Sequence, residues 1–307
     1  MRYDPDHPLV SVLVASYNHA AYIEEAIESI WAQSYPNIEI IVVDDCSTDT
    51  SWTLLPKLVS RTPVPMRIFL NSSNQGPAKT FNNALAEARG DLIAFLASDD
   101  LYTENRFEHS VHLFLKNKSL KAVYANGRTW DGTSAGDRIH KLKAIELLTR
   151  SHIDISKFLY VNSSPLFIQA ALFQKEALEL IGGFNTDLLA DDWLLNAKLF
   201  ASFTKDENFV YLDEDVVLYR QHPTNIHKNY ERHERLKIEF IEKCTPEHLK
   251  AEGFSNIYYW AARKRLKRGE FVISWRYFLL SQQYCFHFSR LSFISTIIKN
   301  YFYKMRA

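Results

Sequence analysis

The sequence has few cysteines, no long hydrophobic run and no excess of one charge. Three widely spaced cysteines in 307 residues argue against a disulfide framework or a zinc site. No apolar run approaches the ~18 residues that span a bilayer, and the amino terminus lacks the features of a signal peptide. Lysine plus arginine and aspartate plus glutamate both total 36. We therefore expect a globular protein of the reducing cytoplasm.

Strands and helices are predicted to alternate through the first 125 residues. Short apolar runs rich in β-branched residues indicate buried parallel strands at residues 9–14 and 38–43, and three further strands are expected at 66–70, 92–96 and 121–125. Helical spacing of apolar residues separates several of these runs, at 21–31 and 77–88. This alternation is typical of a doubly wound α/β sheet, which binds ligands at the carboxyl ends of its strands. The informative residues should therefore follow the strands.

The rest of the chain is less regular. Residues 131–153 are polar and are expected to form a loop with one short helix, whereas 161–184 end in an apolar helical pattern closed by two glycines. A short strand is predicted at 216–219. We place a boundary near residue 230, which gives a catalytic domain at 1–230 and a helical, basic extension at 231–307.

Polar residues follow the first two strands. The first strand leads into Ala15, Ser16, Tyr17 and Asn18, and the second leads into Asp44 and Asp45. A carboxylate at that position can accept the N3–H of uracil or the ribose hydroxyls. Residues 47–49 are good helix N-caps, so we interpret them mainly as capping and assign the nucleotide to Asp45.

The fourth strand leads into Ser98, Asp99 and Asp100. Two adjacent acids at the end of a buried strand are costly unless they are solvated or hold a cation. Mg²⁺ and Mn²⁺ bind through one or two carboxylates plus substrate phosphates, and such a metal neutralises a leaving diphosphate. The alternative is an acidic turn that caps a helix near 105–115.

Two later motifs carry further candidates. Asp191 and Asp192 lie at a predicted helix start, where the helix dipole favours acids in any case. Their functional interpretation is a general base that removes a proton from an acceptor hydroxyl. His222 follows the predicted strand at 216–219, in a chain that already suggests a metal site.

Eight segments in order resemble the family 2 inverting glycosyltransferases of GT-A fold. They are VSVLVASYN (10–18), SIWAQSY (29–35), IEIIVVDDCSTD (38–49), NQG (74–76), ARGDLIAFLASDD (88–100), IGGF (181–184), ADDWLL (190–195) and YRQHPTN (219–225). Together they cover about residues 9–225. The resemblance implies a mixed α/β sheet flanked by helices and an enzyme that uses a nucleotide-sugar donor.

The resemblance also implies roles for individual residues. Asp45 matches the uracil-reading acid, Asp99 the metal-binding acid of an Asp-x-Asp motif with Asp100 beside it, and Asp192 the base next to Asp191. His222 is similar to a late metal or diphosphate ligand. The donor site would further include residues 15–18, Lys79, Asn82 and Ser98. Two departures stand out, because Ala97 replaces the first acid of the motif and Phe81 stands where the family often has arginine.

The carboxyl-terminal extension lies outside the resemblance. From Ala261 onward it has ten lysines and arginines and one acid, Glu270. Apolar residues at helical spacing between Phe288 and Met305 predict an amphipathic helix with basic flanks. Such a helix can lie on an anionic membrane or pack on protein, including a second subunit. The basic run at 263–268 alone does not indicate nucleic-acid binding.

The sequence thus predicts a metal-dependent inverting transferase, with Mn²⁺ or Mg²⁺ and UDP as the default nucleotide. The acceptor would be a saccharide or lipid-linked saccharide in cell-surface polysaccharide assembly, at the cytoplasmic face of the membrane. Two alternatives stay open. Ala97 and Phe81 leave room for a catalytically weak nucleotide-sugar-binding protein. A nucleotidyltransferase has a similar fold, but the segment after the first strand lacks the glycine, lysine and arginine of its phosphate loop.

Overall fold

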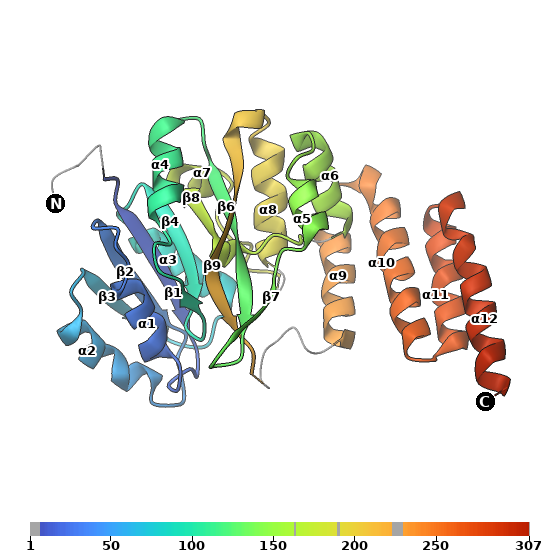
Figure 1. Ribbon diagram of the computed structural model, residues 1–307, viewed down its shortest axis with the longest axis horizontal. Helices are drawn as coiled ribbons and strands as arrows, with labels where there is room; N and C mark the ends of the chain where they lie inside the picture. The colour runs from blue at the N-terminus through green and yellow to red at the C-terminus, as the bar shows by residue number, and fades with distance from the viewer. Residues whose placement is uncertain (1–6, 163, 189–190, 223–229, 307) are drawn as a thin grey trace. The chain divides into compact units, whose positions relative to one another are not determined.

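The computed structural model describes residues 7–162, 164–188, 191–222 and 230–306 (Figure 1). The chain divides into two compact units. Unit 1 lies within residues 1–156 and 165–225, and unit 2 within 157–164 and 226–307. The predicted boundary near residue 230 adjoins 223–229, outside the described residues, and stays a prediction. The inclusion of 157–164 in unit 2 was not predicted.

Unit 1 is built on one mixed sheet, which in the described residues runs in the order β3-β2-β1-β4-β8-β6-β9-β5, with β7 paired to β6. The strands are β1 (Val10–Ser16), β2 (Ile38–Asp44), β3 (Met66–Leu70), β4 (Leu92–Ala97), β5 (Leu101–Tyr102), β6 (Ala122–Trp130), β7 (Ala135–Arg138), β8 (Ala171–Gln174) and β9 (Phe209–Arg220).

The directions of the strands explain why the sheet is mixed. β3, β2, β1 and β4 pair in parallel, β8 is antiparallel to both β4 and β6, and β6 is parallel to β9. The five strands predicted before residue 126 are all present, and the predicted mixed sheet is confirmed. The segment 161–184 ends in α7 as predicted, but it also contains β8, which was not predicted. The strand predicted at 216–219 is present as the last part of the longer β9.

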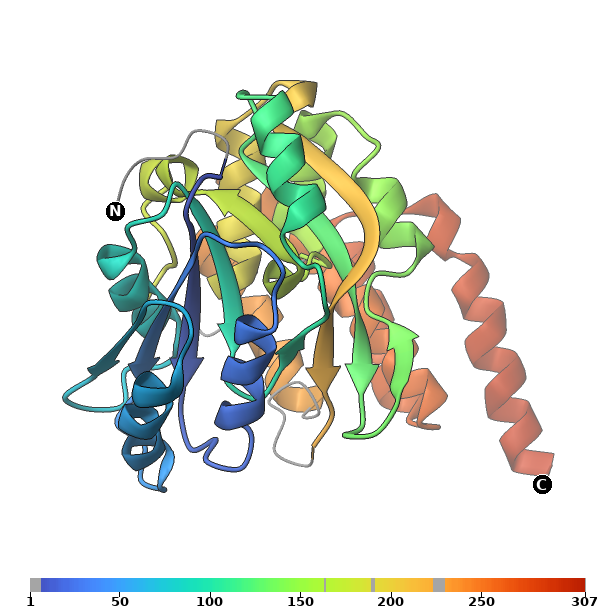
Figure 2. The same ribbon diagram turned by 60° about the vertical axis from the view of Figure 1, so that its left-hand side comes forward.

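Helices lie on both faces of the sheet (Figure 2). Those of unit 1 are α1 (Ile23–Trp31), α2 (Ser51–Arg61), α3 (Pro77–Glu87), α4 (Glu108–Lys116), α5 (Leu142–Leu147), α7 (Lys175–Leu180) and α8 (Asp191–Ser202), while α6 (His152–Asn162) runs from unit 1 into unit 2. The segment 131–153, predicted as a loop with one short helix, also contains β7 and the start of α6. Its strand was missed because residues 135–138 carry no apolar alternation.

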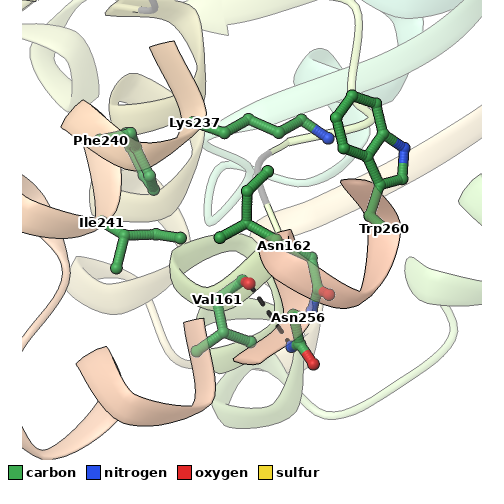
Figure 3. A pocket seen from close by; sticks show the side chains of 8 residues that line it. Val161, Asn162, Lys237, Phe240, Ile241, Asn256 and Trp260 are labelled. Atoms are coloured by element: carbon green, nitrogen blue, oxygen red, sulfur yellow. Dashed lines mark hydrogen bonds between the residues drawn. The ribbon is translucent and has the colours of Figure 1, made fainter. Parts of the chain in front are cut away.

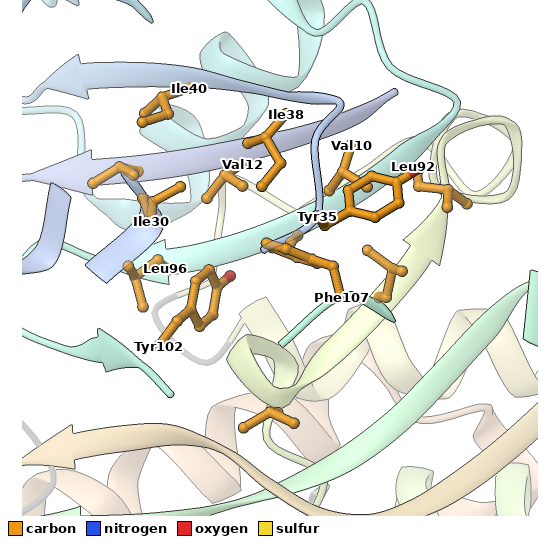
Figure 4. Close-up of a cluster of buried hydrophobic side chains, with 14 of the residues drawn as sticks. Val10, Val12, Ile30, Tyr35, Ile38, Ile40, Leu92, Leu96, Tyr102 and Phe107 are labelled. Atoms are coloured by element: carbon orange, nitrogen blue, oxygen red, sulfur yellow. The ribbon is translucent and has the colours of Figure 1, made fainter. Parts of the chain in front are cut away.

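The core of unit 1 lies between the parallel strands and the helices that cover them (Figure 4). α1 buries Ile23, Ala26, Ile27 and Ile30, the i, i+3, i+4, i+7 face that the spacing predicts. This face packs on β1 and β2, whose residues are almost all buried. The ends of these strands are therefore held rigidly, which suits residues that must keep a fixed geometry.

Unit 2 consists of helices. They are the last residues of α6, then α9 (Tyr230–Cys244), α10 (Glu247–Lys267), α11 (Phe271–Tyr284) and α12 (Ser292–Arg306). A small core joins α10, α11 and α12 through Ala262, Phe278, Phe293 and Ile297. Phe293 and Ile297 of the predicted amphipathic stripe are thus packed on protein. Among the described residues, no helix has the length and apolar character that crossing a bilayer demands.

Candidate active site

A cluster of His19, Ser98, Asp99 and His222 lies where β1, β4 and β9 end. Nε2 of His222 is 2.8 Å from one carboxylate oxygen of Asp99, and Nδ1 of His19 is 3.8 Å from the other. His19 Nδ1 also lies 2.8 Å from the hydroxyl of Ser98. The side chains of His222 and Asp99 are only 8% and 10% exposed. One ligand atom from each of His19, Asp99 and His222 lies within 4.8 Å of the others, so these three side chains can hold a metal ion.

Electrostatics favour the neutral form of His19. Burial lowers the pKa of this imidazole, and Asp99 acts in the opposite direction. Neutral imidazole is the form that binds a metal.

The loop that carries His19 is held firmly, because the side-chain oxygen of Asn18 accepts hydrogen bonds from the backbone N–H groups of Thr48 and Asp49.

The two adjacent acids after β4 have different partners. Asp100 is fully buried, and its carboxylate accepts hydrogen bonds from the Arg220 backbone at 2.8 Å and the Gln169 amide at 2.7 Å. Burial, followed by the charge of Asp99, raises the pKa of Asp100 well above its usual range. The metal-capable cluster therefore contains Asp99 and His222 as predicted, whereas Asp100 is turned toward Gln169 and Arg220.

Arg220 and Tyr22 support His222 from the other side. The guanidinium of Arg220 donates to the Asp99 carbonyl at 2.9 Å and also pairs with Glu25 of α1. The guanidinium carbon of Arg220 lies 5.0 Å from the ring centre of Tyr22. The Tyr22 ring in turn stacks on the His222 ring, with the two ring centres 5.3 Å apart. His222 is thus fixed between a carboxylate and an aromatic ring.

Asp45 lies at the end of β2, beside β1, and is also buried. Its carboxylate accepts hydrogen bonds at 2.8 Å from the amide of Asn71 and from the backbone N–H groups of Gln75 and Gly76. Asp44 instead binds the backbone and hydroxyl of Ser47 and the hydroxyl of Ser16. Asp45 therefore orders the loop between β3 and α3, next to the predicted nucleotide site.

The residues predicted on α3 take different positions. Lys79 is exposed. Asn82 exchanges hydrogen bonds with the backbone of Phe184, donating to its carbonyl at 2.8 Å and accepting from its N–H at 2.9 Å. Phe81 packs against the rings of Phe95 and Phe184. Asn82 and Phe81 thus anchor the Gly182–Phe184 turn within the described structure.

Asp192 lies in the first turn of α8, and Asp191 is the first residue of that helix. Burial raises the pKa of Asp192 to about 6. Tyr219 of β9 is influenced by the charges of both this helix and the cluster. Burial raises the pKa of the Tyr219 hydroxyl, and the charges of Asp100, Asp99 and Asp192 raise it further. The carboxylate of Asp192 therefore lies within electrostatic range of the same tyrosine as Asp99.

The structure brings together Asp99, Ser98 and His222, and it places residues 15–18 and Asp45 at the adjoining strand ends. It adds His19, Gln169 and Arg220, which the sequence analysis missed. His19 directly follows Ser16, Tyr17 and Asn18, and this position is the only feature of the sequence that could have indicated a role in the site. Ala190 and residues 223–225 of the predicted motifs lie outside the described part.

The geometry can be compared with known proteins. A model of glycosyl transferase family 2 matches residues 11–182, more than half of the chain. The chain belongs to glycosyl transferase family 2. It is therefore a glycosyltransferase, as the motifs predicted.

Three similar proteins illustrate the range of the family. An uncharacterised glycosyltransferase of Rickettsia prowazekii is 31% identical over 254 residues, 79% of this chain and 74% of that protein. The UDP-Glc:alpha-D-GlcNAc-diphosphoundecaprenol beta-1,3-glucosyltransferase of Escherichia coli is 36% identical over 118 residues, 38% of this chain and 45% of that protein. A mannosyltransferase from Pyrobaculum calidifontis, in complex with GDP-Man and Mn²⁺, superposes with a TM-score of 0.66 at 21% identity, covering 95% of this chain and 80% of that one. The last likeness shows the fold alone.

Proposed function

We propose that this glycosyltransferase is metal-dependent and inverting, and that it transfers a sugar from a UDP-sugar to a hydroxyl of a saccharide or lipid-linked saccharide. The observation that carries the proposal is the cluster of His19, Asp99 and His222 at the strand ends, and the charge of Asp192 acts on the same tyrosine, Tyr219, as that of Asp99. This reaction needs a cation site for the leaving group and a basic carboxylate for the acceptor hydroxyl.

The chemistry of the cluster fits a divalent ion. Asp99 would supply a hard oxygen ligand, and His19 and His222 would supply imidazole nitrogens. Two nitrogen ligands favour Mn²⁺ over Mg²⁺, which prefers oxygen ligands. The bound ion would supply positive charge that neutralises the nucleoside diphosphate leaving group. The complex of the Pyrobaculum mannosyltransferase with Mn²⁺ supports the choice of metal.

Asp192 is proposed as the base. A sugar hydroxyl is a very weak acid, and a positioned carboxylate that accepts its proton typically contributes ~10²–10⁴-fold to the rate. The pKa of about 6 suits this role, because Asp192 is then mostly ionised at neutral pH and more basic than an ordinary carboxylate. A hydroxyl deprotonated by Asp192 attacks the anomeric carbon opposite the leaving group, and this inverts the configuration.

The nucleotide is proposed to lie over the ends of β1 and β2. Residues 15–18, Asp45 and Ser98 would contact the uridine and its ribose, and Lys79 and Asn82 of α3 would complete the donor site. Asp45 already accepts three hydrogen bonds. A carboxylate with two oxygens has about four lone-pair sites, so one further donor such as uracil N3–H can still bind.

A calorimetric titration with UDP, with and without Mn²⁺, tests these assignments. Asp99→Asn should lose the part of the affinity that depends on Mn²⁺, whereas Asp45→Asn should weaken UDP binding in both conditions. Asp91→Asn is the matched control, because Asp91 is an exposed acid just before the opposite end of β4. If both site variants bind UDP like the parent protein, the donor site lies elsewhere.

We further propose that unit 2 meets an anionic membrane from the cytoplasmic side, in the assembly of a cell-surface polysaccharide. The Escherichia coli relative, whose acceptor is named as a diphosphoundecaprenol lipid, supports the lipid-linked acceptor. Exposed apolar residues gather on unit 2, where they are interspersed with basic ones: Val272, Ile273, Trp275, Leu279, Leu280, Tyr284, Phe286, Phe288, Ile298 and Tyr301. Apolar and basic surface together is what interfacial binding requires.

A further inference from the structure

A pocket in unit 2 has no part in the proposed transfer. It lies between the last turn of α6, α9 and α10 (Figure 3), and it is a small pocket with a cavity volume of about 80 Å³. Its walls are mostly apolar, with Phe240, Ile241 and Ile257 among them. Its polar residues are Asn162, Asn256 and Lys237.

Lys237 brings an ammonium group into this pocket, where no carboxylate of the described residues pairs with it. Its Nζ lies 4.2 Å from the ring centre of Trp260, toward which the side chain extends in Figure 3. Among the residues that the structure describes, Lys237 makes no hydrogen bond or ion pair. Glu234, one turn earlier on α9, is already bound by Arg265 at 2.7 Å. The acid that could have neutralised Lys237 is therefore used by another cation.

Further basic groups surround the same indole. Nζ of Lys264 lies 5.8 Å from the Trp260 ring, and the His233 ring lies 5.8 Å from it between centroids. Burial, followed by the charge of Lys264, lowers the pKa of Lys237 to about 8. Lys237 is half-buried, and a cation–π contact compensates its lost hydration only in part. Among the described residues no carboxylate pairs with Lys237 or with the exposed Lys264, so a bound anion would neutralise positive charge at this pocket.

The amide of Asn256 adds a donor on the opposite wall. Its oxygen accepts a hydrogen bond from Arg290, so its nitrogen is turned toward the Val161 carbonyl, at a long 3.5 Å. This nitrogen can therefore donate to a ligand at little cost. Ammonium and amide donors in a partly apolar pocket are suited to an oxyanion.

We propose that this pocket binds a phosphate monoester or inorganic phosphate through Lys237, with Asn256 as a second donor. Such a group carries −1.5 to −2 charges near neutral pH, which matches the two ammonium groups of Lys237 and Lys264. A small molecule and a lipid headgroup present the same phosphate oxygens, and the experiments below distinguish these two sources. The proposal does not depend on the donor site, because none of its residues belongs to that site.

Chemical footprinting of the parent protein gives the first test. Lys237 should react readily with a trace of acetic anhydride at pH 8, because its pKa of about 8 leaves much of it neutral. Bound phosphate should restore a normal lysine pKa near 10.4 and slow the acetylation by at least ~10-fold. Mass spectrometry compares Lys237 with Lys267, an exposed lysine of α10 whose reactivity should not change. Equal reactivity of Lys237 with and without phosphate would overturn the proposal.

Two experiments complete the test. Calorimetry with inorganic phosphate should detect binding to the parent protein and to the control variant Lys267→Met, but not to Lys237→Met. The affinity for UDP should be the same in all three proteins. Footprinting with vesicles of phosphatidylcholine, with or without phosphatidic acid, then distinguishes the sources. Protection by inorganic phosphate alone identifies a soluble ligand, and protection by phosphatidic acid vesicles identifies a lipid headgroup. Absence of protection by both refutes the site, and an intact phosphate isotherm in Lys237→Met does the same.

Discussion

Replacing Asp192 by asparagine is expected to stabilise the protein and, at the same time, to abolish most of its transfer activity. Asp192 is half-buried in the first turn of α8, and the loss of hydration there raises the pKa of its carboxyl from the ordinary 3.8 to about 6. A carboxyl whose pKa is higher in the folded state than in the unfolded state resists ionisation, so its charge destabilises the fold. Asparagine has nearly the same shape and no charge.

The size and the sign of the stability change follow from the two pKa values. Below pH 3.8 the carboxyl is protonated in both states, and the substitution should have little effect. The penalty grows between 3.8 and about 6 and is constant above. At 1.36 kcal/mol per pKa unit, the charged form costs roughly 3 kcal/mol, which is the gain expected for Asp192→Asn at pH 8.

Urea unfolding at pH 3.5 and pH 8 measures this difference, with EDTA present to remove bound metal. Asp191→Asn is the comparison, since it removes the neighbouring acid of the same helix. In transfer assays, Asp192→Asn should lose at least ~10²-fold in rate while its UDP affinity stays near that of the parent. A variant that is no more stable at pH 8 would refute the burial argument. Transfer at the parent rate would refute the role as base, and a loss in Asp191→Asn alone would move that role one residue back.

Two further predictions concern the turn before α8 and the surface of unit 2. Gly183→Ala should destabilise the protein by ~1–3 kcal/mol in urea unfolding, because φ is 62° and a Cβ would lie 2.6 Å from the Asn82 side-chain oxygen. Gly182→Ala, with φ at 78° but nothing within 4 Å of its Cβ, should lose only ~1–2 kcal/mol; equal effects would contradict the contact argument. The double variant Leu279→Ser, Leu280→Ser should weaken sedimentation with anionic vesicles roughly tenfold, because both leucines are exposed on α11. The control variant Leu180→Ser, at an exposed leucine of unit 1, should sediment like the parent. A parent protein that never sediments with the vesicles at low salt would exclude the membrane contact.

The parts that sequence predicted well are those in which periodicity and burial agree. β1 and β2 are buried along nearly their whole length, so their sequences are apolar apart from Ser11 and Glu39 and end abruptly in polar residues. That abrupt change placed Ser16, Asp45 and Asp99 at strand ends. β1 pairs with both β2 and β4, so the residues after all three meet at one edge of the sheet.

β9 shows why other parts were not predicted. Acidic residues interrupt its apolar pattern, and only its last residues look like a strand. Asp215 is stabilised there by Arg128 and Arg138, each at 2.6 Å, and these arginines come from β6 and β7. An ion-pair network between three strands replaces the hydrophobic pattern. Sequence reasoning on one segment at a time cannot detect such partners.

The same limit explains why Asp99 and Asp100 could not be distinguished in the sequence. Adjacent residues at a strand end point in different directions, and their roles depend on what lies on each side. Gln169 and the backbone of Arg220 occupy one side and engage Asp100, while the imidazoles of His19 and His222 occupy the other and face Asp99. Neither Gln169 nor Arg220 is near β4 in the sequence.

Arg220 connects these contacts and determines where His222 lies. Its backbone N–H binds Asp100, its guanidinium binds the Asp99 carbonyl and Glu25, and the same guanidinium lies over Tyr22. These contacts fix the carboxyl end of β9 against β4 and α1. Because His222 follows only two residues later, its ring is held between Tyr22 and Asp99 before any metal or donor binds. A preorganised metal ligand of this kind loses little conformational freedom when the metal binds. Arg220 therefore contributes to the site by positioning His222, although no contact between Arg220 and the substrate is proposed.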